Sequence, residues 1–313
     1  MLIVINITLP FFLIIFLGFF LKKINFLNHE KTTFLSKFAF FILMPVMMFS
    51  NLYSSVSSDI WNYSFIIRYE LITIVIFIFA LPLSRLINSN KTNAGLLGLN
   101  MAYPNYGYIG IPMCLVAFGS KASMPLALIL FADTLVLLGS TAFLIALTGK
   151  QQSILVVLRN LFKNIFLNPL IISVILGILF GMSGFNLYTP IYDFIKILGS
   201  SAAPVALIAL GGSLSIKKLS KNKKMFSIVL SNKLLLHPIL MASIFIIWPE
   251  EEPVWMQTAI LCACLPVAAN VFVIANHYQT MENESANNIV LTTVFSTITV
   301  PITLFIILNY LNI

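Results

Sequence analysis

The sequence NMAYPNYGYIGIP, residues 100–112, interrupts a long apolar segment and decides the fold. It holds two prolines and two glycines, and each proline removes a backbone donor and clashes with the preceding helical turn. A regular helix is therefore not expected through this segment. A second apolar segment, LPVAANVFVIA at residues 265–275, also places a proline and an asparagine near its middle. We predict that both segments form broken helices.

The whole chain is too apolar for a soluble protein. Of its 313 residues, 59% are hydrophobic and 9% are charged, whereas soluble globular proteins carry about 25% charged residues. A membrane span needs roughly 20 apolar residues, so the chain has material for about ten spans. This composition excludes a soluble enzyme and leaves no room for a soluble domain, so we expect residues 1–313 to form a single transmembrane domain.

A window of about 19 residues predicts an all-α integral membrane protein with ten transmembrane helices. The predicted spans are residues 2–21, 34–53, 63–83, 93–119, 123–148, 165–184, 190–214, 226–248, 255–276 and 287–311. The two segments with prolines near their centres fall in the fourth and ninth spans.

The basic residues predict the orientation of these spans. On the even-numbered connections lie Arg68, Lys121 and Lys196, and the remaining fifteen of the 18 basic residues lie on or beside odd-numbered connections. Because basic residues favour the cytoplasmic side, both termini are expected outside the cytoplasmic (inner) membrane. The net charge of +8 and the basic cluster 217–224 are interpreted as topology signals, and no nucleic-acid partner is expected.

The two halves of the chain share a proline and glycine pattern at an offset of 159 residues. The matched pairs are Pro10 with Pro169, Gly18 with Gly177, and Pro45 with Pro204. An odd number of spans in each repeat forces the second half to enter from the opposite face. We predict two inverted five-helix repeats, residues 1–148 and 165–313, an architecture typical of secondary transporters.

The broken fourth and ninth helices are the predicted substrate site. Irregular backbone at membrane depth is tolerated where it lines a cavity or is buried in protein, and helix N-termini favour anions. Asn105 and Asn270 add neutral donors, so no buried cation is expected beside the anion. The candidate substrate-binding residues are Asn100, Asn105, Tyr106, Pro112, Pro266 and Asn270. The alternative is a pair of proline kinks with packing asparagines.

Two acidic residues are candidates for proton or ion coupling. Asp133 lies in the middle of the fifth span, where an intramembrane carboxylate is a functional hypothesis by default. A neutral structural acid, hydrogen-bonded beside Thr134, is the equal alternative. Glu70 lies near the outer end of the third span and is as well explained by a pairing with Arg68.

Other polar residues in the spans favour structural roles. Lys233 is expected to extend to the cytoplasmic surface, and His237 is expected to mark a kink before Pro238. Three cysteines lie in apolar runs and are interpreted as packing residues: Cys114, Cys262 and Cys264. Neither a metal site nor a cofactor is predicted from these residues.

At the two broken helices the sequence resembles the auxin efflux carrier family, which holds plant PIN-type carriers and bacterial organic-acid permeases. Pro104-Asn105 followed by Gly110-Ile111-Pro112 is similar to the family's P-N-x-x-x-x-G-I-P crossover. Residues 265–278 are similar to the ninth-helix pattern LP…N.FV.A..Y. The resemblance runs over the whole chain.

The resemblance implies a two-repeat carrier with crossed fourth and ninth helices, an elevator-type mechanism and a homodimer. Asn105 matches the crossover asparagine that contacts the substrate carboxylate, Asn270 matches the bacterial pattern, and Glu70 loosely matches an acid that supports the site. The long hydrophilic central loop of many plant carriers is absent, since the fifth connection spans about residues 149–164. A small carboxylate such as malate is therefore a better expectation than auxin.

We thus predict a membrane transporter of a small organic anion and not an enzyme. Two other classes stay open: a sodium/proton-type cation exchanger of related fold, and an intramembrane enzyme acting on lipid. The broken helices carry no Asp-Asp or Asp-Lys pair, which argues against the exchanger. No recognisable catalytic motif surrounds Asp133 or His237, which argues against the enzyme.

Overall fold

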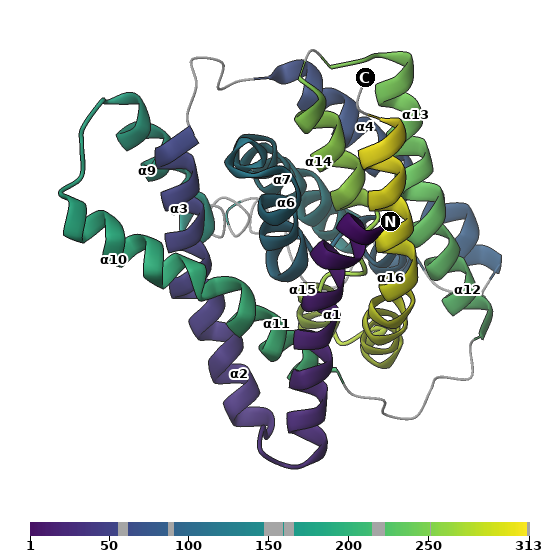
Figure 1. Cartoon of the computed structure of the whole chain (residues 1–313). Helices are drawn as coiled ribbons and strands as arrows, with labels where there is room; N and C mark the ends of the chain where they lie inside the picture. Colours follow the sequence, from purple (N-terminus) through teal and green to yellow (C-terminus); the bar gives the residue numbers. More distant parts are fainter. Residues whose placement is uncertain are drawn as a thin grey trace. The chain divides into compact units, whose positions relative to one another are not determined.

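The computed structural model describes residues 1–55, 62–86, 91–146, 159, 166–214, 223–250 and 252–311. Within these ranges every regular element is a helix, as predicted (Figure 1). Seven of the described helices are long and apolar enough to cross a membrane. Shorter apolar helices occupy residues 106–118, 169–182 and 253–263, and they overlap the predicted fourth, sixth and ninth spans. The described chain is therefore a multi-pass helical protein.

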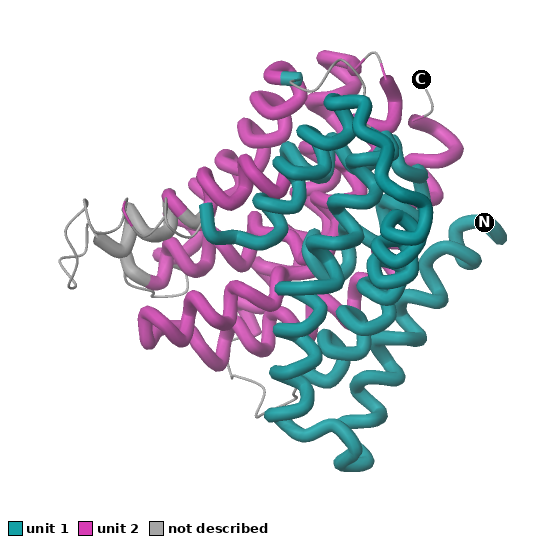
Figure 2. The backbone as a smooth tube through the Cα atoms, turned by 90° about the vertical axis from the view of Figure 1, so that its left-hand side faces the viewer, with its two compact units in different colours: residues 1–62, 106–128, 166–214 teal, residues 63–105, 129–165, 215–313 magenta. Residues whose placement is uncertain are grey.

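The helices form two compact units, coloured separately in Figure 2. Unit 1 comprises residues 1–62, 106–128 and 166–214, and unit 2 comprises residues 63–105, 129–165 and 215–313. Each unit draws helices from both halves of the sequence. The boundary between the units passes between Asn105 and Tyr106, inside the first sequence segment that predicted a broken helix.

Unit 1 contains the first two helical segments of each half of the chain. Its elements are α1 (Leu2–Lys23), α2 (His29–Phe38), η1 (Ala39–Leu43), α3 (Met44–Ser55), η2 (Tyr106–Gly110), α6 (Ile111–Phe118), η3 (Ser120–Ala122), α9 (Pro169–Met182), α10 (Thr189–Ser200) and α11 (Ala202–Ser213). Helix α1 packs along α11, and α9 packs along α3 (Figure 1).

Two glycines allow these helix pairs to approach closely. A Cβ atom at Gly18 of α1 would overlap the carbonyl oxygen of Ile208 in α11. A Cβ atom at Gly177 of α9 would lie 3.1 Å from the carbonyl oxygen of Phe49 in α3. Gly177 and Ile208 are the residues 159 positions after Gly18 and Phe49. The two contacts therefore join matching positions of the two halves.

Unit 2 holds the remaining helices. They are α4 (Tyr63–Leu86), α5 (Lys91–Ala102), the part of α7 (Ser123–Ala146) from residue 129, α12 (Lys223–Ser231), η4 (Asn232–Leu236), α13 (His237–Ile247), α14 (Pro253–Ala263), α15 (Asn270–His277) and α16 (Glu282–Tyr310). Helix α4 packs against α5 and α13, while α16 packs against α12, α14 and α15.

Three π-helical turns share one sequence cause. The turns η1, η2 and η4 each end two residues before a proline, namely Pro45, Pro112 and Pro238. A proline in a helix clashes with the carbonyl of the residue four positions earlier, and that residue lies inside the wider π turn in all three cases. The widened turn relieves the clash without ending the helix. The kink expected at His237-Pro238 is therefore a π turn.

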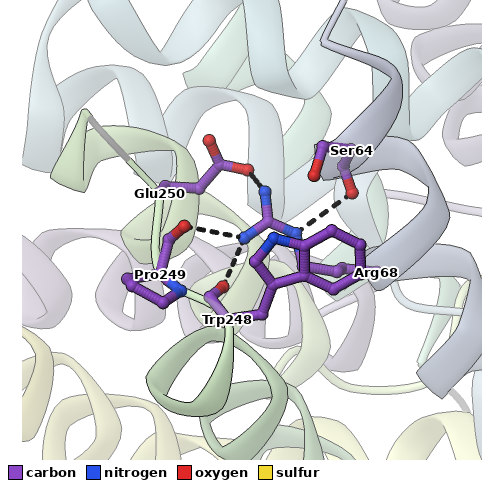
Figure 3. Close-up of polar contacts among 5 residues, drawn as sticks. All are labelled: Ser64, Arg68, Trp248, Pro249 and Glu250. Carbon is purple, nitrogen blue, oxygen red and sulfur yellow. Dashed lines mark hydrogen bonds and ion pairs between the residues drawn. The ribbon is translucent and has the colours of Figure 1, made fainter.

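Arg68 in α4 fixes the loop that follows α13. Its guanidinium donates to the carboxylate of Glu250 and to the carbonyl oxygens of Trp248 and Pro249, and its Nε donates to Ser64 O at 3.1 Å (Figure 3). The same group lies over the rings of Phe245 and Trp248. The suggested pairing of Arg68 with Glu70 is wrong, because the buried guanidinium is committed to Glu250 and backbone carbonyls.

Candidate functional site

Both predicted breaks are present, and they meet within unit 2. Helix α5 ends at Ala102 and helix α14 ends at Ala263. The chain beyond each end leaves the helical pattern, and the two segments pair in an antiparallel bridge between Pro104 and Val267. We call residues 103–105 and 265–268, with the ends of α5 and α14, the crossing. It brings together the two segments that the sequence singled out.

The crossing has a locally two-fold hydrogen-bond pattern. The Asn105 N–H donates to the Pro266 carbonyl oxygen at 2.9 Å, and the Ala268 N–H donates to the Tyr103 carbonyl oxygen at 3.1 Å. Asn105 and Ala268 are 163 positions apart, and so are Tyr103 and Pro266. Exchanging the two members of each pair therefore turns one hydrogen bond into the other. Backbone groups released by the breaks are thus partly satisfied by each other, which buried irregular backbone requires.

A polar face of α16 supports the crossing. Its buried residues Ser285, Asn288, Thr292 and Ser296 recur at helical spacing on one side. The Thr292 hydroxyl accepts a hydrogen bond from the Val267 N–H at 3.1 Å. This face supplies side-chain partners to backbone that has left the helical pattern.

Asn100 belongs to this supporting network. Its side chain donates to Leu96 O at 2.8 Å and to the Ser285 hydroxyl at 3.1 Å, and it accepts from the Asn288 amide at 3.0 Å. The residue is fully buried. These hydrogen bonds hold α5 against α16, and the predicted contact of Asn100 with substrate stays a prediction.

Of the five remaining candidate substrate residues, four are buried and one is exposed. Asn105 and Tyr106 are buried, Pro266 is buried in the crossing, and Pro112 is buried near the start of α6. Asn270 is exposed at the first residue of α15. In unit 2, therefore, Asn270 presents an accessible amide at the N-terminus of a half-helix.

The position of Lys233 in the structure differs from the predicted one. It is fully buried, so the expected extension to the membrane surface is wrong. Its ammonium donates to Ala263 O at 3.0 Å and to Ala102 O at 3.4 Å. These oxygens belong to the last residues of α14 and α5, where helix dipoles place partial negative charge. One cation thus stabilises both helix ends at the crossing, and the expectation of no buried cation there is also wrong.

His237 completes the surroundings of this ammonium. Its Nδ1 lies 3.2 Å from Lys233 Nζ, so an ammonium donor assigns the ring proton to Nε2. Nε2 is buried and makes no hydrogen bond within the described residues. Three acceptors, two carbonyl oxygens and one imidazole nitrogen, match the three N–H groups of the ammonium. All three N–H groups of the Lys233 ammonium therefore have acceptors within the protein.

Asp133 and Glu70 are buried in the same unit. Tyr69 donates to Asp133 Oδ2 at 3.4 Å, and Asp133 interacts electrostatically with both Lys233 and Glu70. The neighbouring Thr134 hydroxyl donates to Leu130 O in its own helix. Asp133 Oδ1 and both carboxyl oxygens of Glu70 make no hydrogen bond within the described residues.

We call Glu70, Asp133, Lys233 and His237 the Lys233 cluster. Sequence reasoning found its acids and missed its cation, although a signal was present. Lys233 and His237 are four residues apart inside an apolar span, a spacing that places both on one helix face. A lysine facing the same side as a histidine before a proline is a better candidate for burial than for a surface position.

The cysteines and the basic cluster 217–224 are the remaining residues interpreted from the sequence. Cys114, Cys262 and Cys264 are buried, in agreement with the packing interpretation. In the described part of the chain, no three His, Cys, Asp or Glu residues lie together so that they could hold a metal ion. Most of the basic cluster 217–224 lies outside the described residues.

These features define a class of protein: a multi-pass helical membrane protein with two broken helices that pair at their breaks. The chain belongs to the family described as "Membrane transport protein", which it matches over residues 3–304. This result agrees with the resemblance to the auxin efflux carriers, and it identifies a transporter and not an enzyme.

Two relatives extend this result. The chain is 30% identical over 304 residues to a Rhizobium meliloti protein named "Putative malonate transporter", covering 96% of this chain and 95% of the relative. It is 29% identical over 231 residues to an uncharacterised transporter of Methanocaldococcus jannaschii, covering 68% and 70%. Both relatives carry transporter names.

Proposed function

We propose that this protein is a secondary transporter of small dicarboxylates across the cytoplasmic membrane. The observation that carries the proposal is the crossing, with the accessible Asn270 amide at the N-terminus of α15 just beyond it. Broken helices in matching positions are the usual sign of a transporter site. Helix N-termini attract carboxylates through their N–H groups and partial positive charge.

In this proposal Asn270 and Asn105 bind the substrate carboxylates. Asn105 donates its backbone N–H within the crossing, which fixes the residue at the break. Lys233 does not bind the anion directly, because its three donors already have protein acceptors. Tyr106, Pro112 and Pro266 shape the backbone on either side of the break. Neutral donors suit reversible binding, since they hold an anion without a permanent opposite charge.

The substrate class follows from the relative and from the site chemistry. The Rhizobium relative is named for malonate, a small dicarboxylate, and it matches almost the full length of both chains. Malate, the substrate first expected from the sequence, belongs to the same chemical class. Two carboxylates fit a site that offers two asparagines and a helix N-terminus. We therefore propose malonate or a close dicarboxylate, and not auxin.

The transport mechanism we propose is alternating access of the elevator type. Ten spans in two inverted repeats would place matching helices in opposite orientations. The matching contacts of Gly18 with Ile208 and of Gly177 with Phe49 support this duplication. The division into two units, each drawing on both halves, supports the movement of one unit against the other. The positive-inside pattern supports termini on the outer side, and the family resemblance supports a homodimer.

Coupling to protons through Glu70 and Asp133 is the proposed driving force. Both side chains are buried in unit 2 and both have carboxyl oxygens without hydrogen bonds in the described residues. A proton carried with a dicarboxylate would reduce the charge that crosses the membrane. Intramembrane acids in transporters commonly have this role.

The test is counterflow in proteoliposomes loaded with unlabelled malonate and supplied with labelled malonate outside. Labelled malonate should accumulate chemically unchanged, and malate should compete while indole-3-acetate should not. Asn270→Ala and Asn105→Ala should lose at least nine tenths of this exchange. Asn309→Ala is the matched control, because this exposed asparagine bonds to its own helix in α16. Exchange at the control level in both site variants would contradict the proposed site.

A cation exchanger is the second candidate, and one observation favours it. The electrostatic contact of Asp133 with Lys233 places an acid and a base beside the crossing, although they lie on α7 and η4 and not on the broken helices. The same proteoliposomes should show no sodium-driven proton movement without a carboxylate. Sodium/proton exchange in the absence of any organic anion would favour this candidate over the dicarboxylate carrier.

A further inference from the structure

The Lys233 cluster contains one buried cation and two buried carboxyl groups, and their contacts differ. Glu70 is only 6% exposed, and neither of its carboxyl oxygens has a hydrogen-bond partner in the described residues. Asp133 is fully buried and receives the Tyr69 hydroxyl. A buried carboxylate without partners carries a large desolvation cost, and a protonated carboxyl group avoids most of it.

The electrostatic contacts distinguish the two acids further. Asp133 interacts with the positive charge of Lys233, whereas the charged group that acts on Glu70 is Asp133. Two neighbouring carboxyl groups in a low-dielectric environment resist simultaneous ionisation. The acid next to the cation is the one that keeps its negative charge. The other acid then lies beside a negative charge and has no cation to offset its own.

We propose that Glu70 is the proton-binding residue of this protein and that Lys233 keeps its neighbour Asp133 ionised. Lys233 is thus a positioning residue that acts on the proton site through Asp133. In this arrangement Lys233 and Asp133 cancel each other's charge, and the proton on Glu70 leaves the cluster neutral. Loss of that proton leaves one uncompensated buried negative charge.

Four other titratable groups around the cluster are competing proton sites. Tyr69 from α4 donates to Asp133, and His237 from α13 accepts from Lys233 through Nδ1. Cys262 and Cys264, at the end of α14, interact electrostatically with Lys233, and Cys264 Sγ donates to Leu261 O. Tyr69, His237 and Cys264 each make a hydrogen bond that the neutral form of the group can make. Glu70 is the group whose polar atoms all lack hydrogen bonds within the described residues.

The first experiment measures the proton on Glu70 without any transport. Infrared spectra of the purified protein at neutral pH report protonated carboxyl groups through their C=O stretching band, which shifts in D2O. Glu70→Gln should remove one such group, and Asp133→Asn should leave it in place. Lys233→Met should add a second group, because Asp133 then loses its cation. Lys233→Arg, the conservative variant, should restore the wild-type band.

Two results would overturn this assignment. An unchanged band in Glu70→Gln means that Glu70 holds no proton. An unchanged band in a folded Lys233→Met protein means that Lys233 does not control Asp133. If Lys233→Met does not fold, the double variant Lys233→Met/Asp133→Asn should fold, since it removes both charges. Failure of the double variant to fold while Lys233→Arg folds would also count against the charge-pair argument.

The second experiment rests on the proposed transport and asks whether this proton is coupled to it. Malonate accumulation by the wild type should rise with an imposed inward proton gradient, and accumulation by Glu70→Gln should not respond to the gradient. Wild-type gradient dependence in Glu70→Gln would overturn the coupling role. If no carboxylate crosses with the wild type, the proposed function fails, while the infrared result still decides where the proton lies.

Discussion

The ammonium of Lys233 lies 3.0 Å from the carbonyl oxygen of Ala263, the last residue of helix α14. The same ammonium lies 3.4 Å from the last carbonyl oxygen of α5, that of Ala102. Two helices that end at buried residues leave unsatisfied carbonyl groups and partial negative charges. The buried ammonium of Lys233 donates a hydrogen bond to each carbonyl group and places a positive charge beside both helix ends. The broken helices and the charged cluster are therefore parts of one structure within unit 2.

Removal of the Lys233 charge should destabilise the protein. Lys233→Met leaves two helix-end carbonyls and Asp133 without their cation, and the loss of one partner from a buried charged group costs about 3 kcal/mol. Thermal unfolding in detergent measures this effect. Lys121→Met, at an exposed lysine of η3, is the control and should unfold near the wild-type temperature. Equal unfolding temperatures for the two variants would contradict the capping role.

Loss of the Arg68 guanidinium should destabilise the protein more than loss of the charge of its acidic partner, Glu250. Arg68→Gln removes the ion pair with Glu250, three carbonyl interactions and two ring contacts together, and should cost about 3 kcal/mol. Glu250→Gln leaves the guanidinium with its carbonyl acceptors and should cost about 1 kcal/mol. The comparison of the two unfolding temperatures checks this order. A larger loss in Glu250→Gln would show that the carbonyl contacts contribute little.

The close packing of α1 on α11 should depend on Gly18. Gly18→Ala places a methyl group onto the backbone of Ile208, which cannot move aside as a side chain can. Overpacking of this kind costs about 1–3 kcal/mol. Gly107→Ala is the matched control, since its new Cβ would meet Met44 at an ordinary 3.6 Å. Thermal unfolding should separate the two variants, and a stable Gly18→Ala protein would argue against the close approach.

The contributions of Asn100 and Asn288 to the free energy of unfolding should be coupled. The Asn288 amide donates to the Asn100 side-chain oxygen at 3.0 Å in a buried setting. Each single alanine variant should lose about 1–3 kcal/mol, because it leaves buried polar groups unsatisfied. The double variant should lose less than the sum of the two. A double-mutant cycle on unfolding measures this coupling, and strict additivity would mean that the hydrogen bond contributes nothing.

The predicted orientation can be tested by sided labelling. The three native cysteines are buried, so the wild-type protein should react weakly with a membrane-impermeant maleimide. Lys121→Cys lies on the predicted outer side and should be labelled in intact cells. Arg159→Cys lies on the predicted cytoplasmic side and should be labelled only after the cells are permeabilised. The reverse pattern would place the termini inside.

Much of the fold followed from composition and from proline positions. Membrane helices are set by apolar length, and the breaks at Pro104 and Pro266 follow from the missing N–H groups. The pairing of Asn105 with the Pro266 carbonyl did not follow, because it joins residues far apart in sequence. The π turns before Pro45, Pro112 and Pro238 were also not predicted, since proline indicates a disruption but not the form that relieves it.

The charged residues of the site were the hardest to predict. A lysine in an apolar span usually extends to the surface, which is why Lys233 was misplaced. Its burial depends on acceptors from α5, α14 and α13 that come together only in the folded chain. The same holds for Arg68, whose partner Glu250 is distant in sequence while Glu70 is close. Proximity along the chain was a poor guide to the acidic partner of Arg68.

The central claim is that the crossing serves the transport of a small dicarboxylate, and counterflow of labelled malonate in proteoliposomes tests it most directly. We predict saturable exchange of chemically unchanged malonate by the wild type and by Asn309→Ala, and a loss of at least nine tenths in Asn270→Ala. No exchange of malonate or malate by the folded wild-type protein, or full exchange by Asn270→Ala, would contradict the account.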